Sequence, residues 1–335
     1  MSPARQRRTV VLAGTAVAAG LVAVTVVAFF VGSSTVGVGE FWTLVIGGEI
    51  TDSARSILIN VRAPRVVAAL LAGAALATAG AIIQSVLDNP LASPNIIGIN
   101  SGAGLAVLLM SAAFPGALAL QPVAAFAGAL VTALIIFALS LGAGTSRLTV
   151  VLAGIALSTI FGAGMNAVLI VNPDVYVGAS TFLVGGLAGM TLAKLTWPAA
   201  YILIGLVVAL FLAGRLTILT LGDTTAHSLG LAVGRWRLGL LGLAALLAGA
   251  AVSFAGLLGF VGLIVPHMVK FIVGHDARVV LPLSAALGAA FVVGCDLVAR
   301  VAFAPYELPV GILMAFLGGP FFIYLIIRNR RVGDG

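Results

Sequence analysis

An aspartate and an arginine lie four positions apart inside a long apolar run near the C-terminal end of the chain. Asp296 and Arg300 are the only charged residues between positions 280 and 302. Charges inside an apolar span are costly and usually functional, and residues four apart lie on one face of a helix. The two could form an ion pair, or Asp296 could carry protons in an ion-coupled transporter. Because Arg300 favours the ionised carboxylate and so opposes proton exchange, we expect the ion pair.

Other residue types that do chemistry lack the spacing that the chemistry needs. The three histidines, His227, His267 and His275, have no cysteine or carboxylate placed to complete a zinc site. Neither of the two lysines, Lys194 and Lys270, follows a glycine, so the phosphate-binding loop of ATPases is missing from the chain. No catalytic residue and no metal ligand is therefore predicted.

The chain consists almost entirely of apolar runs, so the residues named above must be held in place by membrane-spanning helices. Its mean hydropathy is +1.24, and 8% of its 335 residues are charged. A helix needs roughly 20 apolar residues to cross a bilayer. The sequence predicts an all-α polytopic membrane protein with about ten transmembrane helices, at residues 9–31, 66–87, 97–113, 122–142, 149–170, 198–214, 236–254, 257–273, 280–302 and 309–327. Glycines and Pro266 make the segment 257–273 the weakest of them.

Length and composition leave no room for a water-facing domain, so residues 1–335 are expected to form a single transmembrane domain. The 42 glycines predict closely packed helices and helices that are broken where backbone lines a cavity. The single cysteine, Cys295, excludes an internal disulfide bond.

Basic residues indicate the orientation of the chain. The first apolar run follows three arginines, but it is too long for the hydrophobic part of a signal peptide and is kept as a span. With ten spans and residues 1–8 in the cytoplasm, twelve basic residues fall on the cytoplasmic side and five on the other, as the positive-inside rule requires. Both termini are therefore predicted to be cytoplasmic. The net charge of +7 reflects this topology, and no nucleic acid partner is predicted.

Three connections between the predicted spans are longer than turns. Residues 32–65 are expected outside. Residues 172–196, also outside, are apolar enough to dip back into the membrane. Residues 215–237 are polar and cytoplasmic, and they predict one or two short helices that end at Gly222 and Gly230. Such a segment could receive force from a partner protein.

Four sequence blocks occur in an order that is typical of one family. The first, from Arg62 to Ala103, is RAPRVVAALLAGAALATAGAIIQSVLDNPLASPNIIGINSGA. The second is FLVGGLAG from Phe182, and the third is LGDTTAHSLG from Leu221. The fourth starts with GFVGLIVPHMVK at Gly259 and continues through GHDAR, DLVAR, ELPVG and GGPFFIYLI. Over residues 60–328 the chain resembles the FecCD-type permease subunits of ABC importers for iron chelates, haem and vitamin B12. It departs from the family pattern at Phe182 and Gly186, where the family has Trp and Ser.

This resemblance implies a fold and a set of partners. The fold would be the ten-span type II ABC-importer permease, which dimerises, usually with itself. Two ATP-binding cassette ATPases would dock on the cytoplasmic side, and an extracytoplasmic substrate-binding protein would dock on the other. The chain would bind no cofactor, because ATP and magnesium are used by the partner ATPase. It would lie, in contact with membrane lipid, in a bacterial cytoplasmic membrane and carry a ferric siderophore, with haem or vitamin B12 as alternatives.

The resemblance also assigns roles to single residues. Arg62, Arg65 and Arg300 match arginines that meet acidic residues of the binding protein in the family. The third block matches the family's cytoplasmic LGExxAxxLG motif. Within the segment 215–237 it therefore implies ATPase contacts for Leu221, Gly222, Asp223, Ala226, Leu229 and Gly230. The family's pathway lies along spans five and ten, which makes candidates of Met165, Asn166, Leu313, Phe316 and Gly318.

Gln84 is a further pathway candidate because it is polar and lies near the inner end of the second span. Residues of this kind usually form hydrogen bonds between helices, so a structural role is the alternative. Two other classes of function also stay open on the sequence alone, namely an ion-coupled secondary transporter that uses Asp296 and an intramembrane enzyme.

Overall fold

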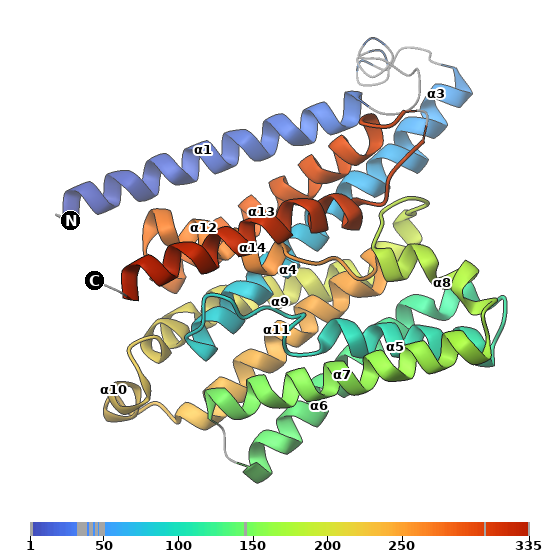
Figure 1. Cartoon of the computed structure of the whole chain (residues 1–335). Helices are drawn as coiled ribbons and strands as arrows, with labels where there is room; N and C mark the ends of the chain where they lie inside the picture. Colours follow the sequence, from blue (N-terminus) through green and yellow to red (C-terminus); the bar gives the residue numbers. More distant parts are fainter. Residues whose placement is uncertain are drawn as a thin grey trace.

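The computed structural model describes residues 3–31, 51–143, 146–304 and 306–333, together with Gly39, Thr43 and Ile46. Figure 1 shows a bundle of long helices joined by short connections. Each predicted span contains a helix. The ten helices at those positions are α1 (Pro3–Phe30), α4 (Ala63–Leu87), α5 (Ile99–Ala113), α6 (Gln121–Ala143), α7 (Arg147–Val171), α9 (Leu192–Leu219), α11 (Val233–Ala255), α12 (Val261–Val273), α13 (Ala277–Val301) and α14 (Val310–Gly333).

Seven of these helices are long and apolar enough to cross a membrane by length and composition, whereas α5, α12 and α14 contribute shorter apolar stretches. The span predicted at 257–273 is helical only from Val261, because Gly256 and Phe260 adopt positive φ angles of 72° and 64°. The segment before α5 is likewise irregular as far as Gly98. Non-helical backbone is tolerated at membrane depth where protein surrounds it.

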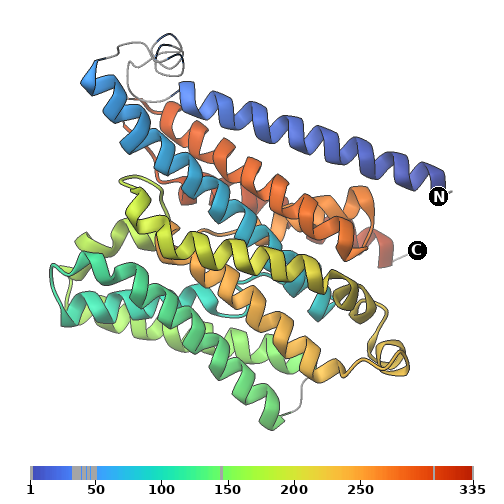
Figure 2. The ribbon, with the colours of Figure 1, turned by 180° about the vertical axis from the view of Figure 1, so that it is seen from behind.

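Five shorter elements complete the described fold, namely α3 (Asp52–Ser56), the π-helical turn η1 (Ile57–Arg62), the 3-10 turn η2 (Leu118–Leu120), α8 (Val175–Val184) and α10 (Asp223–Ser228). Figures 1 and 2 place both ends of the chain and α10 at one end of the bundle, and α3 and α8 at the opposite end. We call these the α10 end and the α8 end. Termini at the same end agree with an even number of spans.

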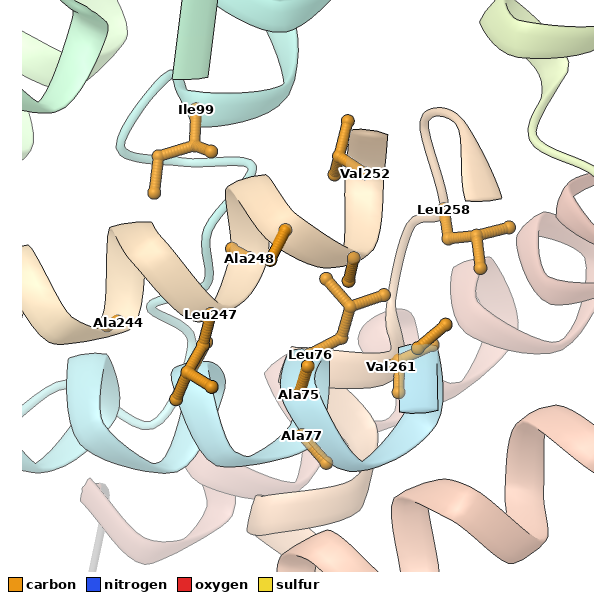
Figure 3. Packing of buried hydrophobic residues seen from close by; sticks show 14 of the residues in the cluster. Ala75, Leu76, Ala77, Ile99, Ala244, Leu247, Ala248, Val252, Leu258 and Val261 are labelled. Atoms are coloured by element: carbon orange, nitrogen blue, oxygen red, sulfur yellow. The ribbon is translucent and has the colours of Figure 1, made fainter. Parts of the chain in front are cut away.

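Helix α4 lies at the centre of the bundle, packed against α9, α11, α12 and α13. Small residues let these backbones approach closely. A side chain at Gly73 would collide with the main chain of Gly288, and one at Gly80 would collide with that of Gly262. In Figure 3, the side chain of Leu76 on α4 points toward α11. One cluster of buried apolar residues runs from Ala28 on α1 to Met314 on α14.

The connection predicted to dip back into the membrane contains α8, which packs on α5. The main chain in and after the last turn of α8 forms hydrogen bonds with three other segments. Gly186 N donates to Ala255 O at 3.0 Å, Leu257 N donates to Phe182 O at 2.9 Å, and Gly311 N donates to Gly185 O at 3.1 Å. This segment therefore fixes the irregular stretch before α12 and the start of α14. Phe182, one of the two departures from the family pattern, is buried here.

Candidate functional site: the two ends of the bundle

The polar segment 215–237 forms one short helix between two long ones. Helix α9 continues to Leu219, α10 covers Asp223–Ser228, and α11 begins at Val233. Gly222 and Gly230 flank α10 with φ angles of 95° and 80°, a region that L-residues rarely adopt. The two predicted breaks are therefore confirmed, and they delimit one short helix.

A chain of ion pairs ties α10 to three other elements. Arg237 Nη2 on α11 lies 2.7 Å and 2.8 Å from the two carboxylate oxygens of Asp223. Arg147 Nη2, at the start of α7, lies 3.4 Å from Asp223 Oδ1, and its Nη1 lies 2.7 Å from Asp88 Oδ2. Asp88 is the residue that ends α4, with a φ angle of 48°. We refer to these four residues as the α10 network.

Asp223, the carboxylate at the centre of the α10 network, is ionised at neutral pH. The hydrogen bond from Arg237 holds the pKa of Asp223 below its ordinary value of 3.8, with a smaller contribution from Arg147 against the opposing effect of burial. A bidentate bond between arginine and carboxylate is among the stronger hydrogen bonds in proteins. A displacement of α10 would therefore be felt at α11 and, through Arg147, at the start of α7.

The apolar residues in and around α10 differ in exposure. Ala226 is fully buried, whereas Leu221 and Leu229 are 55% and 60% exposed. Two large apolar side chains exposed at the α10 end of the bundle are suited to contact another protein. Nearby, the guanidinium of Arg215 lies 4.3 Å from the ring centre of Trp236, which joins the end of α9 to the start of α11.

The three arginines predicted to dock a binding protein come together at the α8 end, but they are buried. Arg62, Arg65 and Arg300 are 3%, 7% and 3% exposed. Arg62 Nη1 donates to Phe29 O at 2.7 Å, and Arg300 Nη2 donates to Ala28 O at 3.3 Å. These two arginines thus satisfy carbonyl groups that the C-terminal end of α1 leaves without helical partners.

Arg65 is bound to two carboxylates. Its Nη2 lies 3.0 Å from Asp296 Oδ1, and its Nη1 lies 2.6 Å from Glu307 Oε2. The predicted ion pair is also present, since Arg300 Nε lies 3.2 Å from Asp296 Oδ2, although without hydrogen-bond geometry. All three arginines are thus held by partners within the chain in this conformation. Their role in docking stays a prediction.

Gln84 links two helices in the interior. It is buried, and its Nε2 donates to Leu263 O at 3.1 Å and to Gly262 O at 3.3 Å, in the first turn of α12. Lys270 Nζ donates to its Oε1 at 3.4 Å. These hydrogen bonds agree with the structural alternative, and a role of Gln84 in the pathway stays a prediction.

The other pathway candidates divide between two helices that lie on one face of the bundle, α7 and α14 (Figure 1). Asn166 is exposed, as is Phe316 at 75%, whereas Met165 and Leu313 are half-buried. Gly318 is buried against the ring of Phe260, at a distance that leaves no room for a side chain. Helix α7 packs on α5 and α6, whereas α14 packs on α12 and α13.

Two features of the site escaped the sequence-based prediction. Arg147 and Arg237 were counted only as cytoplasmic charges, and Glu307 was quoted only within a motif. The available signal for the α10 network was that its two aspartates and two arginines all lie near the cytoplasmic ends of predicted spans. Among the described residues, no group of three histidines, cysteines or carboxylates could hold a metal ion.

Comparison with known proteins gives this geometry a context. The model of the FecCD transport family matches residues 6–328. The chain is 37% identical to the hemin transport system permease protein HmuU of Yersinia pestis over 323 residues, with 94% of this chain and 97% of that protein covered. It is 38% identical over 308 residues to the iron(3+)-hydroxamate import system permease protein FhuB of Bacillus subtilis (strain 168), with 90% and 79% covered.

The fold has a counterpart among solved structures. An inward-facing conformation of a transporter assigned to the metal-chelate type of ABC transporter superimposes with a TM-score of 0.82, at 27% identity, with 94% of this chain and 98% of that chain covered. The family match spans nearly the whole chain, and the helical bundle agrees with it. The chain therefore belongs to the FecCD transport family and is the permease subunit of an ABC transporter.

Proposed function

We propose that this permease carries a ferric siderophore into the cell, within an importer class that takes iron chelates, haem or cobalamin. The observation that carries the proposal is the α10 network, which ties an exposed helix to α4, α7 and α11 in a chain without a phosphate-binding loop. A subunit built in this way receives mechanical work from ATP hydrolysis on another protein. The 38% identity to the hydroxamate permease supports a siderophore, and haem or cobalamin is the alternative because the hemin permease is 37% identical.

The proposed assembly contains two copies of the permease or two related permeases, two ATPases beneath them and one binding protein above. The apolar faces of α7 and α14 would meet across the permease dimer, with Asn166 and Phe316 on the pathway. Leu221 and Leu229 would seat α10 in the ATPase. Both termini and the α10 end would then be cytoplasmic, in a bacterial cytoplasmic membrane, in agreement with the distribution of basic residues.

We keep Arg62, Arg65 and Arg300 as docking residues in this proposal. A carboxylate of the binding protein would have to replace Glu307 at Arg65, or a carbonyl of α1 at Arg62 or Arg300. Charge reversal of a buried arginine would damage the fold, so the test is Glu307→Gln, which releases one donor of Arg65. Tighter capture of the binding protein at low salt supports the exchange, and unchanged capture at every salt concentration contradicts it.

The substrate is tested by uptake. Membrane vesicles that contain the permease with its ATPase are supplied in turn with ferric hydroxamate, haem and cobalamin, each with a binding protein for that ligand from the same organism. The proposal expects saturable, ATP-dependent uptake of the ferric siderophore and background levels of the other two. Uptake of haem or cobalamin alone would replace the siderophore assignment.

A further inference from the structure

A groove of about 540 Å³ opens between α6 and α9 at the α8 end. Its lining includes Val123, Phe126, Lys194, Trp197, Tyr201 and Ser253. Val123 and Trp197 are 66% and 71% exposed, so the groove is open on the outside of this chain. None of the contacts described so far uses it.

The base of the groove is aromatic and apolar. The rings of Phe126 on α6 and Tyr201 on α9 are stacked, with centroids 5.3 Å apart and planes within 4° of each other. Trp197 lies one turn before Tyr201, nearer the first residue of α9. Tryptophan and tyrosine favour the boundary between the lipid chains and the headgroups, and this pair lies at that depth if α9 spans the bilayer.

The mouth of the groove carries a single positive charge. Lys194 lies in the first turn of α9 and is the only charged residue among those that line the groove. Its ammonium group donates to Gly189 O at 3.2 Å. An ammonium group has three donors, so two remain for an anion at the mouth.

We propose that this groove binds an anionic phospholipid of the outer leaflet, with the headgroup phosphate on Lys194 and an acyl chain running past Trp197 and over Phe126 and Tyr201. Seven residues of α-helix separate Lys194 from Tyr201, which is a rise of about 10 Å. This distance suits a phosphate at the interface and a chain that enters the hydrocarbon layer below it.

The position of the groove favours lipid over a second protein chain. Helix α9 lies toward the viewer in Figure 2, whereas α7 and α14 lie toward the viewer in Figure 1, which is drawn from the opposite side. The helices proposed to meet another permease thus lie on the other face of the bundle. The α6–α9 face is left to the bilayer, and one cation within an apolar groove is complementary to a lipid with one negative charge.

The experiment uses Trp197 as the reporter. The full-length permease, assembled with its ATPase and carrying Trp42→Phe and Trp236→Phe, is reconstituted in phosphatidylcholine that contains increasing fractions of lipid brominated on the acyl chain. Brominated phosphatidylglycerol should quench Trp197 fluorescence at lower mole fractions than brominated phosphatidylcholine. We expect a preference of about fivefold, since one basic residue near a membrane surface contributes about 1 kcal/mol to binding an anionic lipid.

Three variants separate the possible outcomes. Lys194→Gln should reduce the preference to about one, whereas Arg55→Gln, which removes an exposed cation of α3 at the same end, should leave it unchanged. Ala193→Phe should reduce quenching by both lipids, because it fills the groove and keeps the charge. Equal quenching by the two lipids in the parent protein would overturn the proposal, and so would a preference that survives Lys194→Gln. Quenching by neither lipid would show that protein covers the groove, which also overturns it.

Discussion

Arg65 Nη2 lies 3.0 Å from Asp296 Oδ1, a contact that joins α4 to α13 at the α8 end of the bundle. Arg300 lies against the other oxygen of the same carboxylate, and Glu307 binds Arg65 from the side. Arg65 and Arg300 thus share the carboxylate of Asp296, and Arg65 also binds that of Glu307. Asp296 is therefore bound on both oxygens by buried arginines of the same chain.

Replacement of Asp296 by Asn should destabilise the permease without changing its energy source. The change leaves Arg65 and Arg300 buried with one carboxylate between them, and breaking a buried ion pair costs about 3–5 kcal/mol. We expect a lower unfolding temperature in detergent and less protein in the membrane, while the remaining uptake still depends on ATP. Glu307→Gln is the control, because its half-exposed carboxylate should cost about 1 kcal/mol or less. Equal effects of the two variants would contradict the central position of Asp296.

Asp223→Asn should loosen the attachment of α10 and partly uncouple ATP hydrolysis from uptake. The amide keeps the size of the side chain but loses the charge that binds Arg237 and Arg147. The ratio of transported substrate to hydrolysed ATP is the measurement, and we expect it to fall severalfold with ATPase activity retained. Ser228→Ala on the same helix is the control, because that hydroxyl bonds only within α10. An unchanged ratio in Asp223→Asn would remove the α10 network from the coupling mechanism.

The ion pair between Asp223 and Arg237 also predicts how the coupling ratio responds to pH. Because the pKa of Asp223 is lowered in the folded protein, its contribution to stability is complete above the ordinary value of 3.8 and is lost as the pH falls through the lowered value. The coupling ratio of the parent should therefore be flat around neutral pH as far as this residue is concerned. A titration of the ratio near pH 7 that disappears in Asp223→Asn would show that this description of Asp223 is wrong.

Gly230 should tolerate asparagine and reject tryptophan. A side chain would have open space around it, so the limits are the φ angle of 80° and the surface that faces the ATPase. Asparagine enters the left-handed region more readily than other L-residues, whereas tryptophan adds bulk where α10 is proposed to dock. We expect Gly230→Trp to hydrolyse ATP with little uptake and Gly230→Asn to transport almost normally. Normal transport by Gly230→Trp would exclude a close fit of this turn against a partner.

Gly318→Ala should disturb α14 through one neighbour, Phe260. A methyl group at position 318 would overlap the phenyl ring, and overpacking of this kind costs about 1–3 kcal/mol. We expect reduced thermal stability and reduced uptake. Phe260→Ala in the same chain should restore part of both, because it removes the ring from the overlap. Gly319→Ala is the control, since nothing lies within 4 Å of a side chain at that position. The absence of any rescue would mean that the ring is not the obstacle.

Most of the fold could be predicted because the bilayer permits few solutions. Apolar length fixed the positions of the helices, and the glycines at 222 and 230 marked the ends of α10. The exact starts of α5 and α12 could not be predicted, since they depend on hydrogen bonds between distant segments, such as Leu257 N to Phe182 O.

The site was predicted less well than the fold. Sequence placed Arg62, Arg65 and Arg300 at one end of the bundle. The burial of Arg62 and Arg300 follows from the path of α1, whose last carbonyls they bind, and Arg65 is held by Asp296 and Glu307. Gln84 was recognised as a polar residue inside a span, and its partners on α12 became visible only in the packed structure. Residues that act through distant neighbours carry little signal of their own in a single sequence.

The central claim is that this permease is driven by ATP hydrolysis on a partner protein, and transport in proteoliposomes tests it most directly. Permease, ATPase and binding protein are reconstituted together, with labelled ferric siderophore outside and ATP or no ATP inside. The account predicts uptake that requires internal ATP, stops with vanadate and survives an ionophore that removes proton and sodium gradients. Uptake driven by an imposed ion gradient in the absence of ATP would contradict the account and would favour an ion-coupled transporter.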